Sequence, residues 1–285
     1  MIFRLLGGMM VLGREDRWTR DRGGDAGSIV SPHNRGFIVP PLGLRSQSAP
    51  RTWTTSLMAP PRFDVLLEDN HLLVISKPVG LPTMGVSDDR PTALNLAKEY
   101  IREQYNKPGN VYLGIVSRLD APTSGALLIA RTSKAAARLT EQFRRGSVTK
   151  QYWALVEGRP PAQETLLRDW VRKDERHRKM HLCNETAPGA QEARLTYRRT
   201  ARVGDASLVE VELLTGRKHQ IRVQLAGQGQ PIVGDRKYGA KLPFAEGIAL
   251  HARRLVFEHP VRREPVEVIA PLPRAWEKYG VSEAS

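Results

Sequence analysis

The chain has 285 residues, of which 40% are hydrophobic and 26% are charged, and its 44 Lys and Arg against 30 Asp and Glu give a formal net charge of +14. These proportions are typical of a soluble globular protein with a sizeable core, and they exclude a collagen-like, coiled-coil or wholly disordered chain. No apolar run approaches the roughly 18 residues that a membrane-spanning helix needs. The single cysteine, Cys183, excludes an internal disulfide framework, and because a lone thiol suits a reducing compartment we expect a cytoplasmic protein.

Residues 1–61 differ in composition from the rest of the chain. They contain eight Gly, six Pro and eight Arg but no Lys, and no helical or strand period persists in them for more than a few residues. The apolar opening lacks both the basic region and the small-residue cleavage site of a signal peptide. We therefore expect 1–61 to be a disordered extension or a misassigned start, with Met58 as the preferred initiator. One folded domain is expected over 62–275, followed by a short tail over 276–285.

Hydrophobic periodicity predicts the elements of the folded domain in chain order. Strands are expected over residues 63–67, 71–76, 111–116, 126–130, 152–156, 165–171, 193–199, 207–213, 250–257 and 266–269. Helices are expected over 93–105, 133–145 and 218–226, with Thr92 and Ser133 as the caps of the first two. Because strands are several times more numerous than helices and do not alternate with them, we predict an α+β fold with a mixed, mostly antiparallel central sheet and flanking helices.

The excess of positive charge indicates a polyanionic partner. A field of this sign attracts RNA, DNA or an anionic membrane surface. Aromatic residues make up only 6% of the chain, which does not favour a surface that stacks many single-stranded bases. Composition therefore predicts a nucleic acid as the partner, with a basic enzyme that acts on small molecules as the alternative.

Several common signatures of cofactor and metal sites are absent from the sequence. Neither G-x-x-x-x-G-K-[ST] nor G-x-G-x-x-G occurs, so nothing indicates ATP or a dinucleotide, and no Gly-x-Ser-x-Gly elbow indicates a serine hydrolase. His177, His181 and Cys183 are close in sequence, but no carboxylate or second cysteine within Arg176–His181 completes a metal site. We expect neither a cofactor nor a metal.

Three short segments combine residue types that carry chemistry. The first is Lys77-Pro78-Val79-Gly80, and the second is Ser117-Arg118-Leu119-Asp120 followed by Thr123-Ser124-Gly125. The third is Thr215-Gly216-Arg217-Lys218-His219-Gln220-Ile221-Arg222, which continues to Gly234-Asp235 and Tyr238-Gly239. Taken alone, the Arg and Asp of the second segment are explained as well by a surface salt bridge as by an active site.

Together the three segments resemble the RluA-type pseudouridine synthases. That family carries a K-P-x-G loop, an H-R-L-D-x-x-T-S-G loop and a G-R-x-H-Q-I-R helix followed by G-D-x-x-Y-G. The resemblance covers about Phe63 to Pro271, with all three motifs in the same order. Two positions depart from it, because Ser117 replaces the usual His and Pro122 stands where Asp is common. The S4 RNA-binding domain of some relatives is not recognisable in this sequence.

The resemblance implies an RNA pseudouridine synthase, an intramolecular transferase of the isomerase class that acts without a cofactor on specific uridines of structured ribosomal or transfer RNA. It implies that Asp120 is the nucleophile, that Tyr152 packs on the uracil ring and that Arg222 pairs with Asp120. Arg118 is expected to fill the space that the flipped uridine leaves. Lys77, Arg217 and Lys218 complete the residues expected at the RNA or in base flipping, and Lys77 is also expected to support the active-site loop. We expect a monomer without a protein partner.

Two other functions compete with this interpretation. A catalytically silent RNA-binding or ribosome-assembly protein on the same scaffold would not need the full set of Asp120, Tyr152 and Arg222. A glycosidase or nucleosidase shares chemistry at C1′ but normally needs a second carboxylate as its acid. The motifs supply only Asp235, in a turn next to Gly234.

Overall fold

A computed structural model describes residues 63–85 and 90–283 of the chain. The predictions for 1–61, including Met58 as the initiator, lie outside the described residues. No helix within the described ranges is long and apolar enough to cross a membrane.

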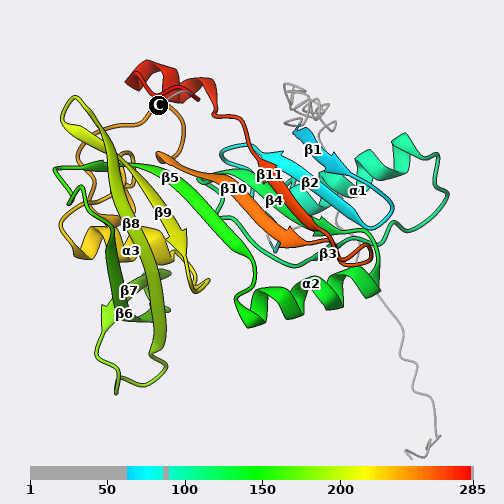
Figure 1. The fold of residues 1–285 in the computed structure, drawn as a ribbon, viewed down its shortest axis with the longest axis horizontal. Helices are drawn as coiled ribbons and strands as arrows, with labels where there is room; N and C mark the ends of the chain where they lie inside the picture. Colours follow the sequence, from blue (N-terminus) through cyan, green and yellow to red (C-terminus); the bar gives the residue numbers. More distant parts are fainter. Residues whose placement is uncertain (1–62, 86–89, 284–285) are drawn as a thin grey trace, which may run out of the picture. The chain divides into compact units, whose positions relative to one another are not determined.

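The strands and helices of the described ranges have the following bounds (Figure 1). The strands are β1 (Asp64–Glu68), β2 (Leu72–Lys77), β3 (Gly114–Ile115), β4 (Ser124–Ala130), β5 (Thr149–Glu157), β6 (Thr165–Asp174), β7 (Lys179–Cys183), β8 (Gln191–Val203), β9 (Ala206–Leu213), β10 (Leu250–Glu258) and β11 (Pro265–Ile269). The α-helices are α1 (Ala93–Gln104), α2 (Ser133–Arg145) and α3 (Gln220–Gly227), and short 3-10 helices η1 (Arg236–Tyr238) and η2 (Arg274–Tyr279) follow them.

The strands of the described ranges form one sheet in the order β1-β2-β4-β10-β5-β9-β8-β6-β7, with β11 paired to β10 and β3 paired to β4. Only β4 and β10 pair in parallel, and the other strand pairs of the described residues are antiparallel. The predicted α+β fold with a mixed, mostly antiparallel sheet is therefore confirmed.

Strand β10 joins the two halves of the sheet. It comes late in the chain, yet it lies between β4 and β5 (Figure 1). His251 of β10 is paired with Ser124 of β4 on one side and with Trp153 of β5 on the other. This pairing brings the loop that precedes β4 close to the middle of β5.

Close approach of β4 to β10 requires glycine at position 125. Gly125 has a φ of +113°, and a Cβ built on it would lie 2.6 Å from the amide nitrogen of Ala252 and still closer to that residue's carbonyl oxygen. A side chain of any size would push the strands apart, and L-residues avoid this backbone conformation. The Gly that follows the second sequence motif thus sets the spacing of the sheet behind that motif.

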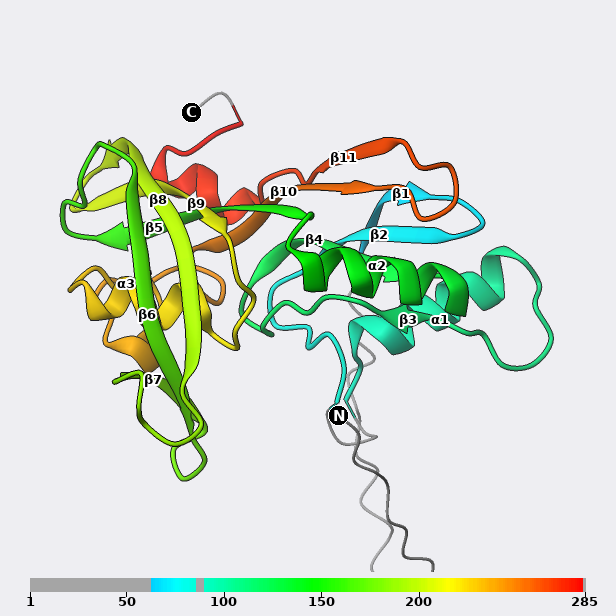
Figure 2. The same ribbon diagram turned by 60° about the horizontal axis from the view of Figure 1, so that its bottom comes forward.

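Helices α1 and α2 cover opposite faces of β2 and β4. Because side chains alternate along a strand, Leu73 and Ile75 of β2 pack in the cluster that contains α1. Leu72 and Val74 pack in the cluster that contains Leu139 of α2. Burial on both faces explains why β2 and β4 are continuous apolar runs. Both helices lie next to this half of the sheet in Figure 2.

The caps of the two helices follow the usual chemistry, with one correction to the prediction. The Thr92 hydroxyl accepts a hydrogen bond from the Asn95 amide at the start of α1, as expected. Thr132, not Ser133, caps α2, because its hydroxyl accepts the Ala135 amide hydrogen bond while Ser133 already has helical geometry. Helix α2 ends at Gly146 in a left-handed conformation.

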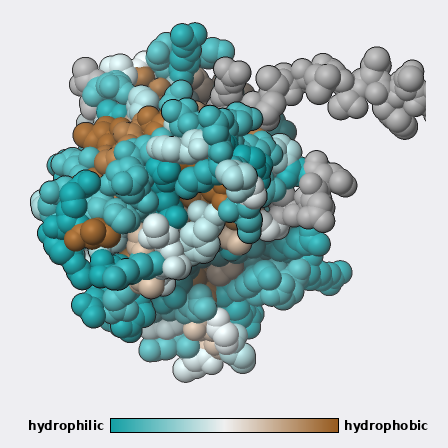
Figure 3. Space-filling model, turned by 90° about the vertical axis from the view of Figure 1, so that its right-hand side faces the viewer, coloured by the Kyte–Doolittle hydropathy of each residue, from teal (hydrophilic) through white to brown (hydrophobic). Residues whose placement is uncertain are grey.

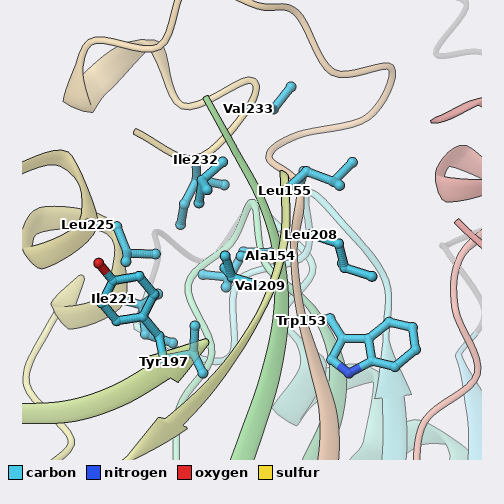
Figure 4. Close-up of a cluster of buried hydrophobic side chains, with 14 of the residues drawn as sticks. Trp153, Ala154, Leu155, Tyr197, Leu208, Val209, Ile221, Leu225, Ile232 and Val233 are labelled. Atoms are coloured by element: carbon cyan, nitrogen blue, oxygen red, sulfur yellow. The ribbon is translucent and has the colours of Figure 1, made fainter. Parts of the chain in front are cut away.

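Helix α3 packs against the other half of the sheet. Figure 4 shows its Ile221 and Leu225 beside Ala154 of β5 and Val209 of β9, two residues that are paired in the sheet. All residues of α3 from Gln220 to Leu225 are buried. The helix therefore carries polar side chains, including an arginine, into the interior of the protein.

The folded region continues beyond the predicted boundary at 275. Trp276 in η2 and Val281 are each 1% exposed and belong to the same core cluster as Ile221. The predicted tail over 276–285 is therefore wrong for its described part, because these two side chains complete the core. Sequence periodicity also missed β7, in which only Met180 is fully buried.

The surface that lies on the right of Figure 1 is mostly hydrophilic, as Figure 3 shows. Hydrophobic side chains appear there only as small separate patches. Large exposed hydrophobic residues of the described ranges are few and scattered over several elements, among them Val65, Tyr112 and Ile269. Scattered residues of this kind are normal on a protein surface and carry no functional argument.

Candidate active site

The loop that follows β2 contains the first sequence motif and holds the backbone of the second motif by hydrogen bonds. The Thr83 hydroxyl donates a hydrogen bond to the Leu119 carbonyl at 2.8 Å and accepts one from the Leu119 amide at 3.1 Å. The Gly80 amide donates to the carbonyl oxygen of Ala121 at 2.8 Å. The backbone on both sides of Asp120 is thus fixed by the loop that follows β2.

Lys77 is buried beneath the same loop and binds its carbonyl oxygens. Its side chain is 0% exposed, and Nζ donates to the carbonyl oxygens of Pro78 and Leu81 at 2.8 Å and of Ala121 at 3.3 Å. Burial lowers the pKa of the ammonium to about 7, although the charge of Asp120 opposes this effect. The expected contact of Lys77 with RNA is therefore wrong, because all directions from its ammonium are occupied by protein, whereas its expected support of the loop agrees with this geometry.

Asp120 lies at the end of a buried chain of charges. Its Oδ2 accepts a hydrogen bond from NH1 of Arg222 at 2.9 Å. The other two nitrogens of that guanidinium, Nε and NH2, donate to the two oxygens of Asp235 at 2.6 and 3.0 Å. Burial lowers the pKa of Arg222, but its bonds to Asp235 and the charges of both carboxylates raise it more, so the side chain remains a cation.

Tyr152 faces the same space from β5. Its side chain is half-buried, and its hydroxyl forms no hydrogen bond with any of the described residues. Burial and the charge of Asp120 both raise the pKa of the phenol, which keeps it protonated at neutral pH. The residue therefore offers a neutral aromatic ring next to an acid.

His219 and Tyr238 add a second set of contacts around Asp120. Nε2 of His219 lies 3.8 Å from Oδ2 of Asp120, and its Nδ1 lies 2.8 Å from the Tyr238 hydroxyl. The Tyr238 ring carries the Arg222 guanidinium at 5.0 Å from its centroid. The His219 side chain makes no cap hydrogen bond at the start of α3. The Gln220 side chain contacts this end of the helix instead, since its Oε1 accepts a hydrogen bond from the Arg217 amide.

A cavity of about 720 Å³ opens beside Asp120. It is lined by Asp120, Tyr152, His219 and Arg222, and by residues from β5, α2 and the loops before β4 and α3. Asp120 is the only acidic residue among its described lining residues, whereas seven are Lys or Arg: Arg118, Arg144, Arg145, Lys150, Arg194, Arg217 and Arg222. Such a cavity attracts a polyanion and presents one carboxylate to it.

The structure thus brings together most of the residues predicted from sequence. Asp120, Tyr152, Arg222, Arg118 and Arg217 all line the cavity, and the two last are exposed. Lys218 is exposed as well but is not among the lining residues.

Sequence reasoning missed or undervalued Thr83, His219, Asp235 and Tyr238. The signal for the last two was the Gly-Asp and Tyr-Gly pair that follows the third motif. Asp235 and Tyr238 follow Arg222 at some distance in the chain, so the sequence alone did not indicate that they contact it.

No cluster of three or more metal-ligating side chains occurs among the described residues. The histidines near Cys183 have other partners, because His177 pairs with Asp174 and His181 accepts a hydrogen bond from Arg172.

Comparison with known proteins identifies the family. The sequence model of the RNA pseudouridylate synthase family matches residues 71–227. The chain is 36% identical over 228 residues to ribosomal large subunit pseudouridine synthase D of Xylella fastidiosa, covering 74% of this chain and 66% of that protein. It is 35% identical over 222 residues to an uncharacterized RNA pseudouridine synthase of Synechocystis, covering 76% and 67%. The chain thus spans about two thirds of the length of these relatives.

Two solved human structures have the same fold. Human RNA pseudouridylate synthase domain containing 4 matches with a TM-score of 0.63 at 25% identity, over 76% of this chain and 93% of that one. Human RNA pseudouridylate synthase domain containing 1 matches with a TM-score of 0.58 at 26% identity, over 74% of this chain and 84% of that one. These matches confirm the resemblance drawn from the three motifs, and the chain belongs to the RNA pseudouridine synthase family of isomerases.

Proposed function

We propose that this protein converts specific uridines of a structured RNA, ribosomal or transfer RNA, to pseudouridine, with Asp120 as the nucleophile. The observation that carries the proposal is the position of Asp120, the single acid among the described residues that line a cavity rich in cations, with Tyr152 beside it. The relative from Xylella fastidiosa is named as an enzyme of the large ribosomal subunit, which supports ribosomal RNA as the substrate class. We further propose that the protein acts as a monomer in the cytoplasm.

The reaction needs no outside reagent. The N1–C1′ bond of uridine breaks, the uracil turns, and a C5–C1′ bond forms. C5 loses a proton and N1 gains one, so atoms and electrons balance within the substrate. A carboxylate assists either by attacking C1′ while the electrons of the N1–C1′ bond leave with uracil, or by adding to the base. Arg222 fixes the orientation of the Asp120 carboxylate in both routes.

Tyr152 suits the step in which the uracil is detached. Its neutral ring lies next to the carboxylate and is held on the central strand β5. A flat aromatic surface contacts a base by stacking and tolerates its rotation in plane. Loss of that surface releases the uracil before it has turned.

The cations of the cavity wall suit the extraction of the uridine from the RNA. Pulling a base out of its stack costs a few kcal/mol. Contacts of Arg118 and Arg217 with the backbone phosphates offset that cost. Arg118 has no hydrogen-bond or ion-pair partner among the described residues, which leaves its guanidinium available to enter the vacated position.

The decisive experiment compares Asp120→Asn with Asp205→Asn, which removes an exposed acid in the turn between β8 and β9. The substrate is RNA from a strain that lacks this protein, and pseudouridine is measured by nucleoside chromatography. We expect Asp120→Asn to lose at least about three orders of magnitude in rate, and Asp205→Asn to behave as the wild type. RNA affinity of both variants should stay within a few-fold of the wild type, because phosphate contacts supply most of it.

The silent-binder alternative makes a different prediction in the same assay. It expects no product from the wild type, together with unchanged RNA binding. A wild type that forms pseudouridine and an Asp120→Asn variant that does so equally fast would show that the nucleophile is misplaced.

A further inference from the structure

The two oxygens of Asp120 have different surroundings. Oδ2 accepts the hydrogen bond of Arg222 NH1 at 2.9 Å, and Nε2 of His219 faces the same oxygen at 3.8 Å. Oδ1 forms no hydrogen bond with any of the described residues. One oxygen is therefore held by protein, while the other is free toward the cavity.

Tyr238 contacts His219 at Nδ1, the ring nitrogen that does not face Asp120. The Tyr238 oxygen accepts a hydrogen bond from the Met180 amide at 3.1 Å and lies 2.8 Å from Nδ1 of His219. Because the Met180 amide donates to the phenol oxygen, the proton of the phenol is available to be donated to Nδ1 of His219. Nδ1 is then an acceptor, so the single proton of a neutral imidazole sits on Nε2 and points at Asp120.

The imidazole is neutral at physiological pH. Burial above all, together with the nearby cations Arg222, Lys218 and Lys237, lowers the pKa of His219 to about 4, against the opposing charge of Asp120. A neutral donor orients the carboxylate without cancelling its charge. An imidazolium at the same place would add a second positive charge to that of Arg222 beside the same carboxylate and weaken it as a nucleophile.

The backbone at His219 is unusual in a way that serves this arrangement. Its φ is +51°, a left-handed conformation that costs a residue other than glycine about 1–2 kcal/mol. The conformation does not serve helix capping, since the side chain makes no cap hydrogen bond. With this backbone the imidazole lies between the Tyr238 hydroxyl and the Asp120 carboxylate, and strain of this kind gathers at functional sites.

Tyr238 connects both groups that contact Oδ2. Its hydroxyl meets His219, its ring carries the Arg222 guanidinium, and the ring is 90° to the imidazole plane at a centroid distance of 5.8 Å. The side chain is 7% exposed, so it does not meet RNA directly.

We infer that His219, fixed in its tautomer by Tyr238, is a positioning residue that holds Oδ2 of Asp120 together with Arg222 and leaves Oδ1 as the attacking oxygen. The inference rests on the proposed function. The distance of 3.8 Å is longer than a hydrogen bond, and we expect it to shorten when a uridine occupies the cavity, as catalytic hydrogen bonds often do.

The test in solution separates the two nitrogens of His219. In His219→Gln the amide nitrogen replaces Nε2 and keeps a donor toward Asp120, whereas His219→Leu removes it. Tyr238→Phe removes only the hydroxyl and keeps the ring against Arg222. His181→Leu is the matched control, since His181 is half-buried on β7 and does not line the cavity.

We expect His219→Leu to slow single-turnover pseudouridine formation about 10- to 100-fold while the Kd for RNA changes less than about threefold, as for a misplaced reacting group. His219→Gln should recover most of the rate, Tyr238→Phe should fall between them, and His181→Leu should match the wild type. Equal rates for His219→Leu and the wild type would overturn the inference. So would a His219→Gln variant as slow as His219→Leu, or a rate loss matched by an equal loss of RNA affinity.

A measurement without catalysis keeps the inference distinct from the proposed function. Long-range ¹H–¹⁵N NMR of histidine-labelled protein reports the tautomer, with His219 assigned from the spectrum of His219→Gln. We expect a neutral Nε2–H imidazole from pH 6 to 8 in the wild type and a mixture of tautomers in Tyr238→Phe. An Nδ1–H tautomer, or titration near pH 6.5, would refute the positioning role even if the protein made no pseudouridine. A correct tautomer in a protein without product would leave the positioning geometry intact and reject the proposed reaction instead.

Discussion

Arg222 and Asp235 form a buried bidentate ion pair, in which Nε and NH2 of the guanidinium meet the two carboxylate oxygens at 2.6 and 3.0 Å. The side chains are 6% and 2% exposed. Because this pair uses two of the three guanidinium nitrogens, the third is directed at Asp120. Asp235, which the glycosidase alternative would need as an acid, is occupied in holding Arg222.

Removal of Asp235 should therefore damage stability and activity together. We expect Asp235→Ala to lower the free energy of unfolding by about 3–5 kcal/mol, because it leaves the Arg222 cation buried with half of its partners. The measurement is urea unfolding. Glu258→Ala, which breaks the exposed pair with Arg263, is the control and should change stability far less. Equal losses in the two variants would contradict a structural role for the buried pair.

Gly125 gives a second test, of the strand spacing behind the active-site loop. Gly125→Ala should destabilise the protein by clearly more than the roughly 1–2 kcal/mol of a left-handed alanine, since the new methyl group meets the backbone of Ala252. Gly158→Ala is a matched control, because Gly158 has a φ of +82° and open space around its Cβ position. Unfolding midpoints of the two variants separate steric overlap from backbone conformation. Similar midpoints would mean that β4 and β10 tolerate a wider spacing.

Acid should weaken the fold through His251. This residue is 0% exposed, its Nδ1 contacts the Ser124 hydroxyl at 2.9 Å, and its Nε2 contacts the Ala270 carbonyl at 3.2 Å. Burial above all, together with the nearby Arg253, lowers its pKa to about 4, although the hydrogen bond to the Ala270 carbonyl and the charge of Glu283 oppose the shift. The unfolded chain binds the proton more readily, so the stability is complete above pH 6.5 and is lost as the pH falls toward 4.

The expected size of this effect is about 2 kcal/mol between pH 7.5 and 5. His251→Gln removes the titrating group, so its stability should vary less with pH than that of the wild type by this amount. Urea unfolding of both proteins at the two pH values gives the difference, in which the titration of other groups cancels. Parallel curves for the two proteins would place the acid sensitivity elsewhere.

RNA affinity should depend strongly on salt, and the cavity wall should account for part of that dependence. Removing one cation that binds a phosphate should reduce the slope of log K against log[salt] by roughly 0.7–0.9. We expect this reduction in Arg118→Gln and in Arg217→Gln, measured by fluorescence anisotropy over a salt series. Arg263→Gln, in the turn between β10 and β11, should leave the slope unchanged. A wild-type slope near zero would show that the positive charge does not lie at the RNA-binding surface.

The sequence predicted the composition of the site better than its geometry. The family resemblance indicated Asp120, Tyr152 and Arg222. Asp120 and Tyr152 come close because β10 pairs both with β4, which follows the loop of Asp120, and with β5, which carries Tyr152, while Arg222 reaches Asp120 from α3. The family resemblance placed Lys77 among the residues expected at the RNA, whereas its side chain is 0% exposed. Only the tertiary structure supplies the three carbonyl oxygens that compensate for its burial.

Other differences have local physical causes. Strand β7 was missed because it has only five residues, follows a run of cationic side chains and, among the described strands, pairs only with β6, as its hairpin partner. The role of Trp276 was missed because a 3-10 helix of six residues has too little periodicity to be recognised. Left-handed backbone at His219 is not encoded by a glycine, so no sequence rule pointed to it.

The position of β10 determines when the site comes into existence. During synthesis the residues of β4 and β5 leave the ribosome long before Leu250–Glu258 are made, and until then the two strands lack the one that lies between them. A nascent chain that already contains Asp120, Tyr152 and Arg222 therefore still lacks the strand that links β4 to β5. Assembly of the site depends on a segment that is synthesised after all three of its residues.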